Sequence, residues 1–153
     1  MVLVQNEILT VRQFCLSDLN SLYKLLSDVD VMQYIEPPFS KQQTEEFLQS
    51  VGLCESPLIY AVQDKESNFV GYVIYHKYEV DGMEIGWVLH KCEWGKGYAD
   101  MLTKMLVANA ALKAKYAVIE CSVEQDITKH IAVKNGFVLE KTENNCDIFQ
   151  LTF

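Results

Sequence analysis

The residue types best suited to chemistry in this sequence gather in the segment Trp94-Gly95-Lys96-Gly97-Tyr98-Ala99. Glycine lets the backbone approach a ligand closely because it has no Cβ. A helix expected to begin at Gly97 adds unpaired N–H groups and the positive end of its dipole, and both attract phosphate oxygens. Lys96 adds a mobile positive charge. The segment therefore predicts a phosphate site, although an ordinary strand-to-helix turn uses glycine in the same way.

Two common phosphate-binding patterns do not fit this segment. The P-loop pattern GxxxxGK[ST] has no match in the chain. The dinucleotide pattern GxGxxG requires a third glycine where Asp100 stands, and a carboxylate there would repel a pyrophosphate. Glu120, at the end of the next expected strand, does resemble the acidic ribose ligand of that pattern. A nucleotide-cofactor oxidoreductase domain is therefore kept as the more distant alternative.

The elements that must position the glycine segment follow from hydrophobic periodicity and turn signals. Apolar and β-branched runs predict strands at residues 8–14, 58–62, 69–75, 83–89, 116–123, 138–140 and 148–153. A helix capped by Asp18 should carry a buried stripe that ends at Val29, and the helix from Gly97 should carry one that ends at Leu112. A capping box at Ser40–Gln43 predicts a further helix, and Asn135-Gly136 should end a short helix that begins at Asp126.

The order of these elements predicts a single α+β domain over residues 1–153. Strands 58–62 and 69–75 should form an antiparallel hairpin, and Asn144-Asn145 should join a last one. Strand 83–89, the helix from Gly97 and strand 116–123 form a βαβ unit, whose strands should be parallel with a right-handed crossover. The result is a mixed sheet with one parallel junction in its middle.

Composition excludes several functions. The 153 residues carry 13 Lys plus Arg against 21 Asp plus Glu, so a net charge of −8 argues against nucleic acid and suits a cationic partner. Five cysteines without a CxxC pair predict buried reduced thiols. The three histidines share no metal-ligand spacing, so no metal site is predicted. No signal-peptide pattern or membrane-length apolar stretch is present, which predicts a cytoplasmic protein without membrane association.

Two stretches together resemble the GNAT acyltransferases, and within them the branch that holds the N-terminal acetyltransferases of ribosomal proteins. Residues 84–102 resemble their acetyl-CoA-binding core, and residues 122–137 resemble their late motif. The order of elements is similar over essentially the whole chain. The resemblance implies the acyl-CoA N-acyltransferase (GNAT) fold, a mixed central sheet with one splayed parallel strand pair flanked by helices.

The sequence departs from the superfamily pattern at four positions. Trp94 stands where most members have Gln or Arg, although this branch shares the Trp. Gln125 replaces an Asn and Thr128 replaces a Ser. Val133 stands where many relatives have the tyrosine that serves as the general acid, and valine cannot donate a proton.

The resemblance implies acetyl-CoA as cofactor and assigns its contacts along the chain. The backbone of Trp87, Val88 and Leu89 would pair with the pantetheine arm, and one N–H would face the acetyl oxygen, where negative charge develops. Gln125 and Thr128 would line the far side of the arm. His130, Lys129 or Lys134 could meet the adenosine phosphate, or form an ordinary solvated helix face. The amides of Gly95, Lys96, Gly97, Tyr98 and Ala99 would hold the pyrophosphate, and Trp94 would also contact the cofactor.

Two further groups concern the reaction and the acceptor. A free alkyl amine has a pKa of roughly 10 and must lose a proton before it attacks a thioester. Glu84 interrupts an apolar strand and is the candidate base, or else an exposed carboxylate on the polar face of the strand. Thr128 can give the leaving thiolate a hydrogen bond. The loop from Tyr34 to Phe39, with Tyr34 and Glu36, could bind a cationic amine, or be only a proline-terminated helix end.

Together these features predict an acetyl-CoA-dependent N-acetyltransferase. Its acceptor is a protein or peptide amino terminus, or a small polyamine-like or aminoglycoside-like amine, which attacks the thioester directly. An acyl-CoA-binding module without turnover is the alternative, and Val133 in place of the tyrosine favours it. The assembly is expected to be a monomer or a homodimer.

Overall fold

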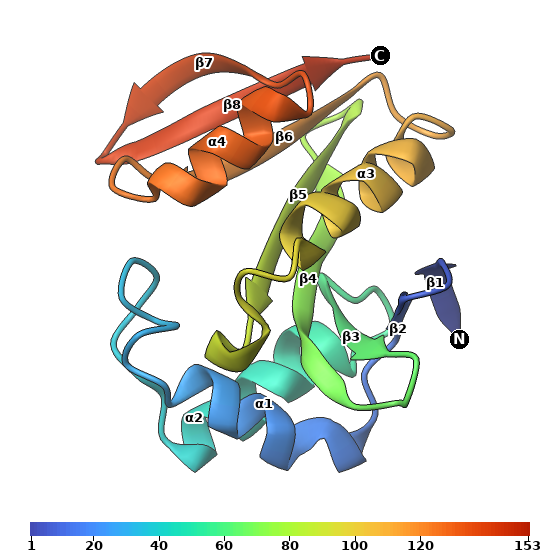
Figure 1. Ribbon diagram of the computed structural model, residues 1–153, viewed down its shortest axis with the longest axis vertical. Coiled ribbons are helices and arrows are strands. Elements are labelled where there is room, and N and C mark those ends of the chain that lie inside the picture. The colour runs from blue at the N-terminus through green and yellow to red at the C-terminus, as the bar shows by residue number, and fades with distance from the viewer. The chain divides into compact units, whose positions relative to one another are not determined.

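An eight-stranded mixed sheet carries the elements of this protein, for which a computed structural model describes residues 1–153 (Figure 1). Its hydrogen-bonded order is β1-β2-β3-β4-β5-β6-β8-β7. The pair β5–β6 is parallel, whereas β1–β2, β2–β3, β3–β4, β6–β8 and β7–β8 are antiparallel. The strands are β1 Val2–Gln5, β2 Leu9–Arg12, β3 Ile59–Asp64, β4 Phe69–Tyr78, β5 Gly82–Leu89, β6 Tyr116–Ser122, β7 Val138–Glu143 and β8 Cys146–Thr152.

The helices are short, and local signals set their ends. They are α1 Leu19–Leu26, α2 Lys41–Phe47, α3 Tyr98–Ala110 and α4 Asp126–Lys134. Ser40 and Gln43 form the predicted capping box, in which the Ser40 hydroxyl oxygen accepts from the Gln43 N–H at 3.1 Å. Gly136 ends α4 with a φ of +91°, and the Phe137 N–H donates to the Ala132 carbonyl at 3.0 Å. Both predicted helix boundaries are confirmed.

The chain forms two compact units that interleave in sequence. Unit 1 comprises Met1–Ile74 and Trp87–Lys96, and unit 2 comprises Tyr75–Gly86 and Gly97–Phe153. The strands β4 and β5 each pass from one unit to the other. In unit 1, α1 packs against α2 beside a core of apolar side chains from the helices and strands. The largest of these are Phe14, Leu22, Leu25, Leu26, Met32, Leu48, Ile59 and Tyr72.

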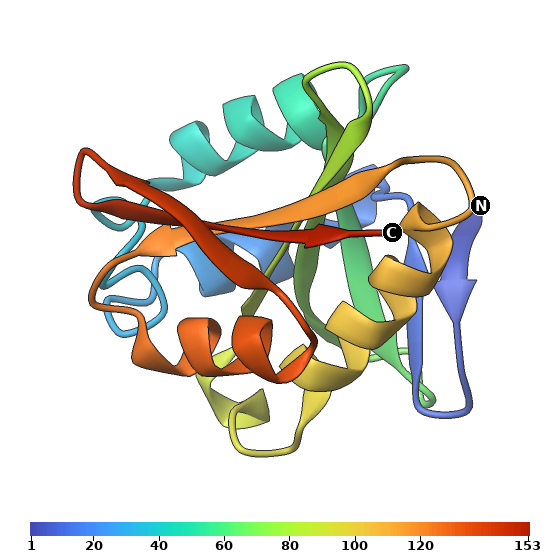
Figure 2. The ribbon, with the colours of Figure 1, turned by 90° about the horizontal axis from the view of Figure 1, so that it is seen from above.

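Unit 2 is built on the pair β6–β8. These strands are paired from Tyr116 opposite Thr152 to Ser122 opposite Cys146. Helices α3 and α4 pack against each other and against β6, and Figure 2 shows α4 running beside the last hairpin. Asn144 and Asn145, with φ of +51° and +63°, form the turn of that hairpin as predicted. Fully buried side chains from α3 and α4 include Leu102, Leu106 and Ala132.

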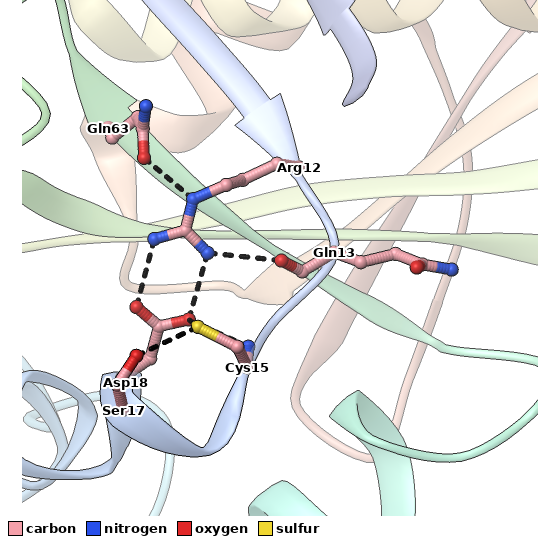
Figure 3. Close-up of polar contacts among 6 residues, drawn as sticks. All are labelled: Arg12, Gln13, Cys15, Ser17, Asp18 and Gln63. Carbon is pink, nitrogen blue, oxygen red and sulfur yellow. Dashed lines mark hydrogen bonds and ion pairs between the residues drawn. The ribbon is translucent and has the colours of Figure 1, made fainter. Parts of the chain in front are cut away.

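A buried ion pair fixes the start of the helical region in unit 1 (Figure 3). The guanidinium of Arg12, on β2, contacts both carboxylate oxygens of Asp18 at 2.8 and 2.9 Å. Arg12 also donates to the Gln63 side chain at 2.6 Å, and the Cys15 N–H donates to Asp18 at 2.9 Å. The side chain of Asp18 is only 8% exposed. The network therefore ties β2 and β3 to the turn that precedes α1.

Several sequence expectations are corrected by the fold. The strand predicted at 8–14 is present as β2, but it is not the first strand, because β1 precedes it and pairs with it in an additional hairpin. Val29 lies beyond the end of α1 and is 70% exposed, and Leu112 lies beyond α3 and is 85% exposed. All five cysteines are free, but only Cys121 is buried, and Cys15 and Cys92 are exposed. No helix of the structure has the length and apolar character needed to cross a bilayer.

Candidate functional site

The predicted glycine segment forms the turn between β5 and α3. After β5 the chain makes one 3-10 turn, Lys91–Glu93, and Gly97 is the residue that precedes α3. Gly95 and Gly97 both have a φ of +80°, a left-handed conformation that favours glycine. A Cβ added at either position would meet no atom within 4 Å. Backbone conformation therefore requires both glycines, and the space beside their α-carbons is open.

Polar contacts within unit 1 hold the side chains on either side of Gly95. The Trp94 indole N–H donates to the Leu89 carbonyl at 3.1 Å, although Trp94 is 49% exposed. The Lys96 ammonium lies 2.9 Å from a carboxylate oxygen of Glu93. In the strand before the turn, Trp87 is half-buried and Val88 and Leu89 are buried. The turn thus presents an exposed indole and a lysine beside the end of β5.

Asp100, in the first turn of α3, has its charge compensated. It pairs with Lys104 at 2.6 Å and with Lys134 at 3.3 Å, and it accepts a hydrogen bond from the Asn135 amide at 2.8 Å. The hydrogen bonds from Lys104 and Asn135 are the largest causes that lower the pKa of Asp100 to about 2. The objection that this carboxylate would repel a pyrophosphate is therefore weakened, and Asp100 instead links α3 to the end of α4.

The parallel pair β5–β6 separates partway along both strands. Its ladder covers three residue pairs, Gly82–Tyr116, Met83–Ala117 and Glu84–Val118. Beyond this point Ile85 and Gly86 of β5 are not paired with Ile119 and Glu120 of β6. The predicted splay is confirmed, and Glu84 is the last residue of β5 that still belongs to the ladder.

Glu84 belongs to a group of four polar side chains in unit 2, which we call the carboxylate cluster: His76, Tyr78, Glu84 and Glu120. The Nε2 atom of His76 lies 3.1 Å from Oε2 of Glu84, and these side chains are 24% and 19% exposed. Nδ1 of His76 lies 2.8 Å from the Lys77 carbonyl oxygen. Glu120 interacts with Glu84 and with the Tyr78 hydroxyl. Glu84 is therefore half-buried with a partner, unlike an exposed edge carboxylate.

The electrostatics of the cluster follow from two neighbouring carboxylates with one imidazole. The hydrogen bond to Glu84 raises the pKa of His76, against the opposing effect of burial. Burial, and then the charge of Glu84, raise the pKa of Glu120. These shifts identify a place where a proton or a cation is favoured. No group of three or more His, Cys, Asp or Glu side chains has the arrangement needed to hold a metal ion.

Sequence reasoning found Glu84 but missed its partners. The histidines share no metal-ligand spacing, Tyr78 carries no sequence signal of its own, and Glu120 resembles only a ribose ligand. One signal was available, because His76 and Tyr78 are two residues apart and so share a face of β4. The pairing of Glu84 with Val118 likewise places Glu120 on the same face, two residues further along β6.

The late motif forms the connection from β6 into α4. The Gln125 side-chain oxygen accepts from the Ser122 N–H at 2.8 Å, so this side chain is bound at the end of β6. Thr128 is half-buried in the first turn of α4, whereas His130 and Val133 are exposed. Lys129 donates to the Val123 carbonyl at 3.1 Å and lies 3.5 Å from Asp147. Lys129 and Lys134 thus both have partners within unit 2.

The loop predicted to bind substrate is anchored at one end and exposed at the other. The Phe39 N–H donates to the Leu26 carbonyl at 2.8 Å, and its ring packs edge-on against Phe47 at 5.7 Å. Tyr34 is 41% exposed, and Glu36 is exposed beside it. Burial, and then the charge of Glu36, raise the pKa of the buried Tyr72. The loop therefore displays an aromatic ring and a carboxylate on the surface of unit 1.

A family model described as an acetyltransferase (GNAT) domain matches residues 9–138. A relative from Bacillus subtilis (strain 168), the uncharacterized N-acetyltransferase YnaD, is 29% identical over 93 residues. That alignment covers 60% of this chain and 55% of the relative, so the chain spans about half the length of the curated relative it matches.

Solved structures share the fold over nearly the whole chain. A GNAT-family acetyltransferase from Bacillus anthracis has a TM-score of 0.88 at 23% identity, covering 99% of this chain and 98% of its own. Spermidine N-acetyltransferase from Vibrio cholerae, solved with CoA and spermine, has a TM-score of 0.78 at 22% identity. The match covers 95% of this chain and 94% of that structure. An acetyl transferase from Salmonella typhimurium modifies the N-terminal serine of a 50S ribosomal subunit protein. It has a TM-score of 0.82 at 17% identity, and the match covers 100% of this chain and 99% of that structure.

Proposed function

This chain belongs to the acetyltransferase (GNAT) domain family, and from that premise we propose that it transfers the acetyl group of acetyl-CoA to a primary amine. One observation carries the proposal. The ladder between β5 and β6 ends after three residue pairs, and β5 then leads into a turn shaped by two left-handed glycines. An extended arm that ends in a diphosphate needs both features, because the arm can run beside a strand that has left its ladder, and the start of a helix attracts phosphate oxygens.

The contacts proposed for the coenzyme follow the chain through that turn. The backbone of Trp87, Val88 and Leu89 would pair with the pantetheine arm, and the amides from Gly95 to Ala99 would hold the pyrophosphate. Open space beside Gly95 and Gly97 supports this assignment, because an anion can approach the N–H groups there. Lys96, Trp94 and Tyr98 would border the same site.

The late motif completes the proposed coenzyme contacts. Gln125 and Thr128 would line the far side of the arm, and His130 would meet the adenosine phosphate. His130 is favoured over Lys129 and Lys134, because both lysines already contact carboxylates of unit 2. Thr128 would give a hydrogen bond to sulfur as the thiolate leaves, since a hydroxyl is a donor but a poor acid.

Glu84 is the proposed base. Acetyl-CoA supplies the activated acetyl thioester. The acceptor arrives largely as an ammonium, with a pKa of roughly 10 for an alkyl amine and roughly 8 for a peptide amino terminus. Glu84 accepts the ammonium proton, so that the nitrogen lone pair becomes available for attack. Its place at the end of the β5–β6 ladder and its half-buried side chain support this role.

The acceptor proposed is a peptide or protein amino terminus, or a small polyamine. The two classes are those on which the Salmonella typhimurium and Vibrio cholerae acetyltransferases act. Tyr34 and Glu36 would contact the acceptor, because an exposed ring and carboxylate favour a cation. The acidic balance of the chain, −8, favours a cationic acceptor of either kind.

Release of CoA thiol across a panel of amines tests the proposal. Peptides that begin with Ala, Ser or Met are compared with spermidine, in the wild type and in E84Q. We expect turnover with at least one class and a loss of about 100-fold or more in kcat for E84Q. E140Q, which changes an exposed glutamate of β7, is the matched control and should keep the wild-type rate.

Three outcomes would contradict parts of the proposal. CoA binding without turnover on any amine would favour a non-catalytic acyl-CoA-binding module. A thermal shift with NAD and none with acetyl-CoA would favour the oxidoreductase alternative. An E84Q variant with wild-type rates at every pH would remove Glu84 from the role of base.

A further inference from the structure

The hydrogen bonds of His76 fix where its protons must lie. A carbonyl oxygen can only accept, so the 2.8 Å contact between Nδ1 and the Lys77 carbonyl requires a proton on Nδ1. A neutral imidazole with that tautomer has a lone pair on Nε2. Nε2 in turn lies 3.1 Å from Oε2 of Glu84, and an ionised carboxylate also only accepts. The second contact is therefore a hydrogen bond only if one more proton lies between His76 and Glu84.

We infer that His76 and Glu84 share one proton, and that His76 is the positioning residue that sets the protonation state of the proposed base. The inference rests on the proposed role of Glu84 and extends it to a residue outside the coenzyme and acceptor contacts. In the resting pair the imidazole is protonated and the carboxylate is ionised. The pair becomes competent to accept a proton when that shared proton is lost to solvent.

The proton then moves from the substrate to Glu84 and from Glu84 to His76. One N–H bond of the substrate ammonium breaks, and its electron pair stays on nitrogen as the attacking lone pair. An O–H bond forms on Glu84, and the same proton passes from oxygen to Nε2 of His76. The imidazolium and the carboxylate are thereby restored, and water takes the proton from the pair before the next turnover.

Groups on four further strand positions modulate this pair. Tyr78 on β4 and Glu120 on β6 face it, and the charge of Glu120 raises the pKa of His76 after the larger effect of Glu84. Cys146 lies on β8, and burial, followed by the charge of Glu120, raises the pKa of its thiol. Lys141 on β7 is the cation that acts on Glu120. Carboxylates predominate, so the surroundings favour a protonated imidazole.

The pairing is tested first without any substrate. Nitrogen-15 NMR of the imidazole rings is followed against pH, and H76Q assigns the resonance among only three histidines. We expect both His76 nitrogens to carry protons near neutral pH. In E84Q the pKa of His76 should fall, because the amide N–H of the variant donates to Nε2 and favours the neutral ring. An unprotonated Nε2 in the wild type, or a titration that E84Q does not move, would overturn the inference.

The consequence for catalysis is tested by the pH profile of kcat/KM. Wild-type activity should fall on the acid side as His76 becomes protonated. In H76Q we expect the plateau above the acid limb to fall by about tenfold or more, because the ring that takes the proton from Glu84 is gone. The acid limb itself should shift to lower pH, because the titrating imidazole is absent. K65Q, which changes an exposed lysine in the turn between β3 and β4, is the control and should leave the limb in place.

The NMR titration and the pH profile together distinguish a failure of this inference from a failure of the proposed function. An H76Q variant that loses activity with an unmoved acid limb would show that His76 is only structural and would contradict the inference. If E84Q keeps full activity while the NMR titration shows the shared proton, the pair exists but Glu84 is not the base, and the proposed function fails at that point instead.

Discussion

The largely buried ion pair between Asp18 and Arg12 contributes to the stability of unit 1. Burial by itself would raise its pKa, but hydrogen bonds from Arg12 and from the Cys15 N–H, together with the Arg12 charge, leave the pKa lowered. The side chain is 8% exposed and the Arg12 side chain 22% exposed, so solvent screens the pair only partly. Removing one partner leaves an uncompensated charge near the core, which is costly.

We expect D18N to lower the free energy of unfolding by about 2–3 kcal/mol. D30N is the control, because the Asp30–Lys91 pair is more than half exposed on both sides, and its loss should cost about 0.5 kcal/mol or less. Urea denaturation at pH 7 measures both variants. Equal losses in D18N and D30N would contradict the assignment of a buried, stabilising pair.

The lowered pKa of Asp18 also predicts a pH dependence of stability. A group whose folded pKa lies below its unfolded value, about 3.9, stabilises the fold above that value and loses the effect as pH falls through the folded pKa. The wild type should therefore lose stability on acidification more steeply than D18N. Urea midpoints between about pH 5 and pH 2 check this, and parallel curves would contradict it.

At the scale of elements, two glycine positions do not accept a larger residue without strain, one on β4 and one directly before α3. Gly71, on β4, has a φ of +153°, and a Cβ there would lie 2.2 Å from the Val88 carbonyl oxygen. Gly97, before α3, has a φ of +80° but open space around it. The first position is therefore closed by packing and the second only by backbone conformation.

We expect G71A to lower the free energy of unfolding by about 3 kcal/mol or more, because neither β4 nor the Val88 backbone can move without breaking the core of unit 1. Thermal and urea unfolding measure the loss. A cooperative transition at the wild-type midpoint would show that the strands can adjust, contrary to this prediction.

We expect G97A to lose only about 1–2 kcal/mol of stability, because a left-handed residue with a Cβ is strained. Its CoA affinity should fall by about tenfold or more, because the amides of the turn would be displaced from an anion. Calorimetric titration with CoA measures the affinity. G136A is the control, because it replaces another left-handed glycine at the end of α4. Its free energy of unfolding should fall by a similar amount, and its affinity for CoA should stay unchanged.

Elements with a local signal are the ones that the sequence predicts well. The Ser40 and Gln43 side chains each bond the backbone N–H of the other within one turn, and Gly136 needs only its own backbone conformation. Both helix ends could therefore be located in advance. The end of α1 could not, because the Asp28 side chain accepts from the Asp30 N–H at 2.9 Å and turns the chain away before Val29 can extend the helix. The strand β1 depends on pairing with β2 and had no separate signal.

The same distinction applies to the candidate site. Glu84 and the glycine turn stand out because each contrasts with its immediate neighbours in sequence. His76, Tyr78 and Glu120 become partners of Glu84 only through the registers of β4, β5 and β6, which are set by contacts between distant segments. A single sequence shows which residues of one strand share a face, but it does not show the register between strands. The carboxylate cluster could therefore be identified only from the structure.

At the scale of the whole molecule, the charge of −8 should act on any cationic acceptor as it approaches. A negative surface raises the local concentration of cations, and added salt screens that attraction. The effect grows with the charge of the acceptor, so a polyamine should be affected more strongly than a peptide with one amino group. The proton transfer that we propose for Glu84 follows binding, so its rate should depend less on salt.

We therefore expect KM for spermidine to rise several-fold between about 50 mM and about 500 mM NaCl, with little change in kcat. A peptide whose only charge is its amino terminus is the control and should show a smaller rise in KM. Initial rates at each salt concentration measure both. An identical salt dependence for the two acceptors would show that the overall charge does not steer binding.

The uneven exposure of the five cysteines has a practical consequence for labelling. Cys15 and Cys92 lie at the surface, Cys54 and Cys146 are half-covered, and Cys121 is buried with a pKa raised to about 11, first by burial and then by the charge of Asp147. A maleimide dye should attach quickly to the first two and reach the last only after denaturation. Any colorimetric count of freed sulfhydryl groups must therefore begin from protein whose surface thiols have already been capped.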